Sequence, residues 1–259
     1  MKKFLTALFI YILISTSVFA RDIRFVQITD VRYKEGDNQN LSAVIKDVNK
    51  VKNIEFVVFT GDIIDRAQKE NLEAFLAQAK KLKKPYYIVI GDKDVNKHRD
   101  LSKKQFARIL KKKIRGYKPE TNNYIFEKNG VVFMVVDGSK DVIPSTNGYY
   151  KDDVLEWVDA NLDLYAKKNV VILQHFPIIP PTNNENYYTF KAENYMKILK
   201  KHSNVKAIIS GHFGVNKEII QDGIVHISTA PVPNYRIIDI IDCTSNNPTF
   251  WAEIKNISK

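Results

Sequence analysis

Short apolar runs alternate along the chain with segments whose apolar residues recur every three or four positions. The runs IRFVQIT (23–29), IEFVVFT (54–60) and YYIVI (86–90) have the length and composition of buried strands. The segments between them, 41–51 and 72–82, carry apolar residues at helical spacing, and Pro85 is expected to end the second helix. This alternation is typical of βαβ units and predicts a largely parallel sheet covered by helices.

The second half of the chain continues the pattern and then becomes rich in strands. Further helices are predicted around 101–110, 152–166 and 192–201, and further strands at 170–174, 205–210, 235–242 and 250–254. Two hairpins are expected, one over 124–137 turned at Asn129-Gly130 and one over 217–228 turned at Asp222-Gly223. No internal repeat or linker interrupts the pattern, so we predict one domain over residues 21–259.

The first twenty residues, MKKFLTALFIYILISTSVFA, have the features of an export signal. Lys2 and Lys3 form a positive start, an apolar segment follows, and VFA precedes Arg21 at the expected cleavage point. We therefore predict a signal peptide over 1–20 and a periplasmic or secreted protein. An uncleaved N-terminal membrane anchor stays open as the alternative, because the apolar run approaches the length of a spanning helix.

Composition changes this picture in two respects. The formal net charge of +11 is compatible with partners such as a phosphorylated small molecule, a lipid headgroup or the surface of an anionic membrane, but a solvated lysine-rich surface is the simpler explanation. Nucleic acid is not indicated, because the basic runs lack interleaved aromatic residues. Cys243 is the single cysteine, so the chain has no internal disulfide and depends on packing.

Aspartate or histidine follows five of the predicted strands within three residues. These residues are Asp30, Asp62, Asp92, His175 and His212. Ligands of open α/β sheets bind at the carboxyl ends of the strands, so the five side chains are expected to share one crevice. Each taken alone has a simpler explanation, as a turn former, a helix cap or a packed histidine. Their recurrence after five strands favours a common site.

The ligand types indicate which metal such a site takes. Carboxylate oxygens with imidazole nitrogens, and without thiolates, suit a divalent ion such as Mn, Fe, Zn or Co. Metal ions held in this way orient a substrate oxygen and activate water, which is the basis of metal-assisted hydrolysis. The pattern therefore predicts a hydrolytic metal centre.

The motifs ITDVR, TGDIID, GDKD, QHFP and SGHFG occur in the order and spacing of one known family. The chain resembles the calcineurin-like metallophosphoesterases from about residue 23 to at least 230. The resemblance implies a four-layer αββα sandwich of two mixed β-sheets with a two-metal centre at one edge. It also implies hydrolysis of a phosphomonoester or a phosphodiester.

The first of the two metal sites that the resemblance implies is incomplete here. The family holds this metal with a D-x-H pair, a bridging aspartate and the last histidine of G-H-x-H. The matching positions in this chain are Asp30, Arg32, Asp62 and Gly214. Two of the four ligands are therefore missing, and one of them is replaced by a permanent cation.

The second implied metal site is intact. Its positions are Asp62, Asp92, His175 and His212. Lys93 stands where the family has a catalytic histidine, and Asp94 is kept as a supporting carboxylate.

These substitutions suggest one electrostatic hypothesis. Without a first metal, Asp30 and Asp62 would repel each other, and Arg32 with Lys93 would supply the two missing positive charges. We therefore expect one metal ion rather than two, with Arg32, Lys93 and Asp94 as candidate catalytic residues. Arg32 and Lys93 would clamp the phosphate, and Lys93 would protonate the leaving oxygen if its pKa were depressed.

Two functions stay open at this point. One is an exported phosphoesterase with a single metal, and the other is an inactive pseudo-phosphoesterase that binds an anionic ligand or an envelope partner. The loop over 175–188 lies where specificity loops usually occur. Its Tyr187 and Tyr188 could either stack on a substrate or pack the loop onto the body of the protein.

Overall fold

The computed structural model describes residues 22–34, 36, 39–114 and 121–258. The predicted signal peptide lies outside these residues, so its prediction is not tested. Within the described ranges, no helix has both the length and the apolar character needed to cross a membrane.

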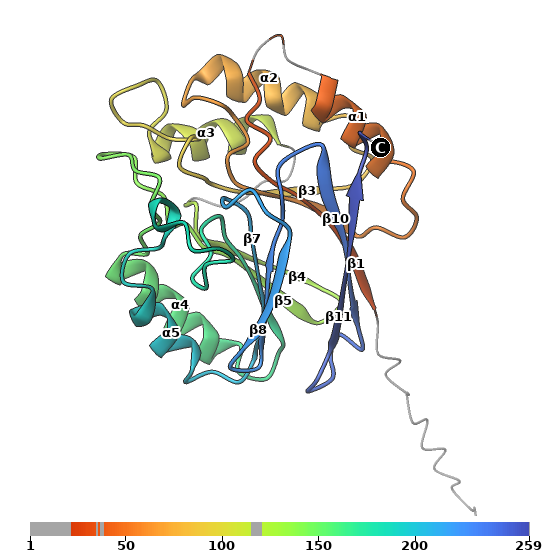
Figure 1. Ribbon diagram of the computed structural model, residues 1–259, viewed down its shortest axis with the longest axis vertical. Coiled ribbons are helices and arrows are strands. Elements are labelled where there is room, and N and C mark those ends of the chain that lie inside the picture. Colours follow the sequence, from red (N-terminus) through yellow and green to blue (C-terminus); the bar gives the residue numbers. More distant parts are fainter. Residues whose placement is uncertain (1–21, 35, 37–38, 115–120, 259) are drawn as a thin grey trace, which may run out of the picture.

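Two mixed β-sheets form the centre of the molecule (Figure 1). The first has the strand order β11 (Thr249–Asn256), β10 (Asn234–Ile241), β1 (Ile23–Ile28), β2 (Phe56–Thr60) and β3 (Tyr86–Val89). The second has the order β4 (Tyr124–Lys128), β5 (Val131–Val135), β6 (Val170–Leu173), β7 (Val205–Ser210), β9 (Ile224–Ser228) and β8 (Lys217–Gln221). Strands β1 to β3 are parallel, as are β5, β6, β7 and β9, whereas the remaining pairs are antiparallel.

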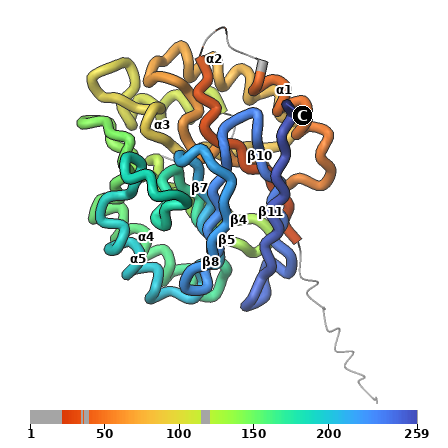
Figure 2. The backbone as a smooth tube through the Cα atoms, in the orientation of Figure 1, coloured from red at the N-terminus to blue at the C-terminus, as the bar shows by residue number. Residues whose placement is uncertain are grey.

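Helices cover the outer face of each sheet, which completes the predicted αββα sandwich. The first sheet is covered by α1 (Gln39–Val48), α2 (Lys69–Ala79) and α3 (Lys103–Lys113), and the second by α4 (Asp152–Leu164) and α5 (Ala192–Leu199). A short 3₁₀ helix, η1 (Glu185–Tyr187), lies in the loop after β6. Figure 2 shows that each helical layer comes from one half of the chain, while β10 and β11 return to pair beside β1.

Successive side chains of each strand point to opposite faces of its sheet. This alternation produces three apolar layers, one between the sheets and one under each set of helices. In β2, Phe56 and Val58 point between the sheets, whereas Val57 and Phe59 pack under the helices. Rings join the two sheets, because Phe56 stacks on Phe25 with centroids 4.8 Å apart and meets Phe133 edge-on at 5.0 Å. Burial on both faces explains why these strands read as continuous apolar runs.

The predicted elements are confirmed within a few residues at most of their ends. The hairpin of β4 and β5 turns at Asn129-Gly130, where both residues have positive φ, +47° and +87°, as a two-residue hairpin turn requires. One boundary is wrong, because α2 ends at Ala79 rather than at Pro85. Leu82 continues the apolar spacing from a turn, in which its amide donates to the Ala79 carbonyl at 3.0 Å.

Candidate metal centre

The carboxyl ends of strands from both sheets meet at one edge of the sandwich. Asp30, Asp62 and Asp92 follow β1, β2 and β3 by two or three residues, and His175 and His212 follow β6 and β7 by two. The structure therefore brings together all five residues that the sequence analysis proposed as ligands.

Three of these residues adopt a backbone conformation that is uncommon outside glycine. The φ angles are +49° at Asp30, +50° at Asp62 and +74° at His212. Aspartate and histidine tolerate this left-handed region better than most residues, and such strain concentrates at functional sites. A hydrogen bond of 2.9 Å from the Phe213 amide to the Gly211 carbonyl closes the turn around His212.

Glycines allow the ligand loops to touch one another. A Cβ at Gly61, where φ is +88°, would collide with the His175 ring. A Cβ at Gly211 would collide with the Thr29 hydroxyl and lie 2.7 Å from an oxygen of Asp30. Both positions require a residue without a side chain because the loops approach so closely.

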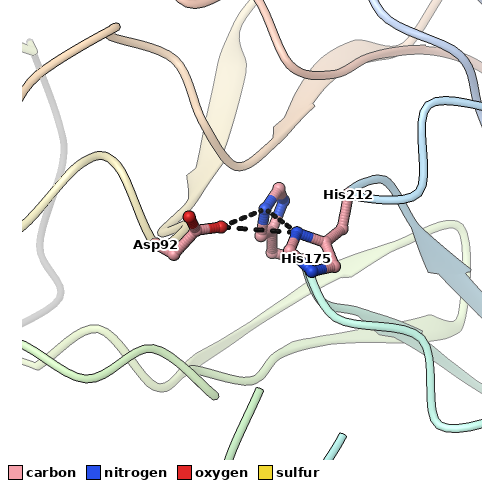
Figure 3. A group of neighbouring side chains, drawn as sticks. All are labelled: Asp92, His175 and His212. Carbon is pink, nitrogen blue, oxygen red and sulfur yellow. Dashed lines mark hydrogen bonds and ion pairs between the residues drawn. The ribbon is translucent and has the colours of Figure 1, made fainter. Parts of the chain in front are cut away.

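One cluster consists of Asp92, His175 and His212, whose side chains point toward one another (Figure 3). Oδ1 of Asp92 lies 3.3 Å from Nε2 of His175 and 3.3 Å from Nδ1 of His212. The two imidazole nitrogens are themselves 3.2 Å apart. Three ligand atoms therefore converge on a space the size of one ion.

The ring of His175 is held in a fixed orientation. Its Nδ1 lies 2.8 Å from the Thr60 carbonyl, which only accepts hydrogen bonds, so Nδ1 is the donor. In the neutral imidazole the lone pair is then on Nε2, which faces the cluster. Such an outer hydrogen bond is the usual way of orienting a metal-binding histidine.

Asp30 and Asp62 form a second cluster with the same His175. Oδ2 of Asp30 accepts hydrogen bonds from the Thr29 hydroxyl at 2.8 Å and from the His212 amide at 2.9 Å. Oδ1 of Asp62 accepts from the Lys93 amide at 2.9 Å and lies 3.5 Å from Nε2 of His175. Asp62 therefore belongs to the second cluster, and His175 is common to both.

Arg32 and Lys93 cover these carboxylates on the solvent side. Arg32 lies 3.4 Å from Asp30 and 3.8 Å from Asp62, and Lys93 lies 3.7 Å from Asp62 and 3.4 Å from Asp92. The two cationic side chains are 43% and 29% exposed, whereas those of Asp30 and Asp62 are fully buried. The cations therefore form an outer layer over a buried anionic one.

In the absence of a bound cation, burial and neighbouring charges oppose each other in setting the pKa values of the buried ligands. Desolvation raises the pKa of Asp62 to about 8. Burial alone would lower the pKa of His175, but Asp62 and Asp92 outweigh it and raise that pKa to about 10. Burial likewise acts to raise the pKa of Asp92, but the neighbouring imidazoles of His175 and His212 outweigh burial and lower that pKa.

The pKa of Lys93 moves away from the range of a proton donor. Burial acts to lower it, but the charges of Asp62 and Asp92 outweigh burial and raise it. The ammonium therefore stays charged at neutral pH, which suits electrostatic binding of an anion better than proton transfer.

Buried polar atoms without partners test whether a metal fits. Within the described part of the chain, Oδ2 of Asp62 and Oδ1 of Asp92 are buried and accept no hydrogen bond. Unpaired buried polar atoms are costly, and a cation would satisfy oxygen atoms of this kind. The residues therefore fit a divalent ion bound by oxygen and nitrogen.

Asp94 lies outside both clusters. Its two oxygens accept hydrogen bonds from the amides of Gly91 at 2.8 Å and Ile64 at 3.1 Å. Burial raises its pKa to about 6, partly offset by these two bonds. The carboxylate therefore braces the loops after β2 and β3.

Sequence reasoning missed Gln27, which ties the two sheets together below the site. Its amide nitrogen donates to the Thr60 hydroxyl at 2.9 Å and to the Ser210 carbonyl at 2.8 Å, and its oxygen accepts from Thr229 at 2.6 Å. The signal was an uncharged polar residue flanked by Val26 and Ile28 inside the run IRFVQIT.

The loop after β6 packs against the site by its aromatic residues. The Tyr187 ring meets His212 edge-on at 5.0 Å and Phe213 at 5.7 Å. Of the two alternatives for this tyrosine, the structure shows packing onto the body of the protein.

Comparisons with solved structures identify the same fold in two phosphatases and in a third protein. A dimetal phosphatase from Danio rerio superposes with a TM-score of 0.65 at 16% identity, covering 84% of this chain and 95% of that one. A purple acid phosphatase from yellow lupin (Lupinus luteus) seeds gives 0.67 at 14% identity, covering 93% of this chain and 52% of that one. TT1561 of Thermus thermophilus gives 0.63 at 13% identity, covering 91% and 99%.

The sequence comparisons give the family. The search among curated proteins found no match. The family model described as calcineurin-like phosphoesterase matches residues 23–216, which is most of the chain and includes all five clustered ligands. The chain therefore belongs to the calcineurin-like phosphoesterases, a family of metal-dependent hydrolases.

Proposed function

We propose that this protein is an exported phosphoesterase that hydrolyses a phosphomonoester or a phosphodiester with a single divalent metal ion. The ion would be held by Asp62, Asp92, His175 and His212. The observation that carries the proposal is the pairing of Arg32 and Lys93 with Asp30 and Asp62. The charges of Arg32 and Lys93 replace the charge of the first metal. The ligands of the second site remain available to bind one divalent ion.

The bound metal would supply Lewis-acid activation of water and of a phosphoryl oxygen. Arg32 presents its guanidinium partly to solvent, where its N–H groups can bind phosphoryl oxygens in pairs. Lys93 stays charged and adds a second positive group beside Asp92. Both cations are in place before the substrate arrives, as electrostatic stabilisation of a phosphoryl transition state requires.

Export is proposed from the N-terminal segment alone. The two lysines, the apolar stretch and VFA before Arg21 support cleavage after residue 20. Mass spectrometry of the protein recovered from the periplasm or medium should give a chain that begins at Arg21. Recovery only in the membrane fraction with an intact N-terminus would support the anchored alternative.

Elemental analysis combined with turnover tests the metal proposal. The full chain, supplied with Mn, Fe, Zn or Co, should retain about one ion and hydrolyse an aryl phosphate monoester or diester. Asp62→Asn should lose both the ion and the turnover, because Asp62 is one of the four ligands proposed for the ion. Asp163→Asn on the exposed surface is the control and should lose neither. Two tightly bound ions, or none, would contradict the proposal.

Substitution of the cations separates the active enzyme from its alternative. Arg32→Gln and Lys93→Gln should keep the metal but each lower kcat/KM about a hundredfold, by analogy with loss of one charge-stabilising group. If the wild-type protein binds one ion but hydrolyses no ester, the active enzyme is rejected. The alternative, a pseudo-phosphoesterase that binds an anionic ligand, is then favoured.

A further inference from the structure

A pocket of 190 Å³ lies beside the candidate metal centre on the side of Lys93. Lys93 and Asp92 line this pocket and also belong to the centre. Two arginines, Arg66 and Arg99, line it as well. Neither arginine has a part in the proposed hydrolysis, so their common location needs a separate explanation.

The loop that carries Arg99 is anchored firmly between β3 and α3. Its ends, Val95 and Leu101, are buried, and the Asn96 amide donates to the Leu101 carbonyl at 2.7 Å. The Arg99 amide donates to the Asn96 carbonyl at 3.0 Å and closes the turn. The loop therefore holds the Arg99 backbone at a defined place on the rim of the pocket.

Arg66 comes from the loop after β2, which is held in place by hydrogen bonds on either side of Arg66. The amide of the neighbouring Ile64 binds the buried Asp94 carboxylate at 3.1 Å. The amide of Gln68 donates to the Arg66 carbonyl at 2.7 Å. Two separate loops thus bring one guanidinium each to the same hollow.

The positive charge of the pocket is only partly neutralised within the protein. Arg66 lies 3.8 Å from Asp65, which also lines the pocket, but this pair is largely exposed and therefore weak. Arg99 has no ion pair among the described residues. Lys93 faces Asp62 and Asp92, which the proposed metal would share. The pocket repels a second cation and favours an anion.

We propose that this pocket binds a second anionic group of the substrate, next to the phosphate that is cleaved. The proposal rests on the proposed function, because it places the cleaved phosphate at the metal centre. Arginine forks bind carboxylate and phosphate groups in pairs of hydrogen bonds, so either group is suitable. Lys93 lines both sites and lies between the two anions. The substrate is thus a phosphoester with a carboxylate or a further phosphate close to the scissile group.

Binding of non-hydrolysable probes tests the pocket without any turnover. Methylphosphonate carries one anionic group, phosphonoacetate adds a carboxylate, and methylenediphosphonate adds a second phosphonate. Calorimetry on the full metal-loaded chain at one fixed ionic strength should show at least one two-anion probe binding about tenfold more tightly than methylphosphonate. Which one gains identifies carboxylate or phosphate as the second group.

Arginine variants assign that gain to the pocket. Arg66→Gln and Arg99→Gln should each remove most of the advantage of the two-anion probe and leave methylphosphonate binding unchanged. Arg108→Gln, on the exposed face of α3, is the matched control and should retain the advantage. Equal binding of all three probes to the wild type, or an equal loss in Arg108→Gln, would overturn the proposal.

The failure of this proposal is distinguishable from failure of the proposed function. Turnover of a simple aryl phosphate depends on the metal centre alone and should be unchanged in Arg66→Gln and Arg99→Gln. If the protein cleaves the aryl phosphate but binds all three probes equally well, the pocket proposal is rejected. The proposal that the protein is a phosphoesterase is then unaffected.

Discussion

Gln27 offers the sharpest test of how the two sheets hold the ligands in place. It is fully buried and bridges β1 of the first sheet to β7 of the second through Ser210. Gln27→Met keeps the length and volume of the side chain but removes its donor and acceptor. We expect a less stable protein with weaker metal binding, because Asp30 and His212 come from loops on opposite sides of this bridge.

The magnitude follows from the three hydrogen bonds that the substitution removes. Each bond contributes about 1 kcal/mol net, and a buried partner left unsatisfied costs about 1–3 kcal/mol. The Ser210 carbonyl keeps a hydrogen bond from the Thr229 amide at 3.2 Å, so the loss is that of the three side-chain bonds themselves. We therefore expect a loss of about 3 kcal/mol, a large part of the ~5–15 kcal/mol that stabilises a typical domain.

Urea unfolding of the metal-free chain measures this loss, and titration with the metal measures the affinity. Gln174→Met is the matched control, because Gln174 is equally buried but makes one hydrogen bond, to the Phe176 carbonyl at 2.7 Å. Gln174→Met should cost about 1 kcal/mol. If Gln27→Met costs no more than this control and leaves the metal affinity unchanged, the bridge does not hold the ligands.

Two further predictions concern single buried positions. Gly61→Ala should cost about 2–4 kcal/mol in urea unfolding and weaken metal binding, because φ is +88° and the new methyl would meet the His175 ring. Gly223→Ala, at φ +77° in open space, should cost only about 1 kcal/mol, and equal costs would contradict this reasoning. Burial lowers the pKa of His226 to about 4, so the unfolded chain binds its proton at higher pH than the folded one. The free energy of unfolding should therefore fall by about 3 kcal/mol between pH 6.5 and pH 4, and urea titrations of His226→Phe should lack this part of the decline.

Apolar periodicity was sufficient to predict the helices and the buried strands, whereas the arrangement in two sheets was expected only from the resemblance to a family. Strands such as β2 are apolar on both faces, and this feature identifies a buried sheet without any tertiary information. The end of α2 was not predictable, since Leu82 keeps helical spacing after the helix has stopped. Leu82 is partly buried against the same core, and this explains the continued pattern. Packing there needs an apolar residue whether or not the backbone is helical.

The ligand positions were predictable because each depends on where a strand ends. The arrangement of charge around them was not, because it depends on side-chain directions across loops. Asp94 shows this, since its motif position indicated a supporting carboxylate but not that its oxygens accept hydrogen bonds from the Gly91 and Ile64 amides. Arg66 and Arg99 carried no signal at all, because they are 33 positions apart and meet only in the folded chain.

The two layers of the centre differ in how freely substitution can change them. At Gly61 and Gly211 an added methyl has no space, so the inner loops tolerate almost no alteration. At Gly214 an added Cβ meets nothing within 4 Å, although φ there is +72° and strains other residues. Arg32 and Lys93 are likewise partly open to solvent. New reactivity on this scaffold can therefore arise by exchanging residues of the outer layer over an inner frame that stays fixed.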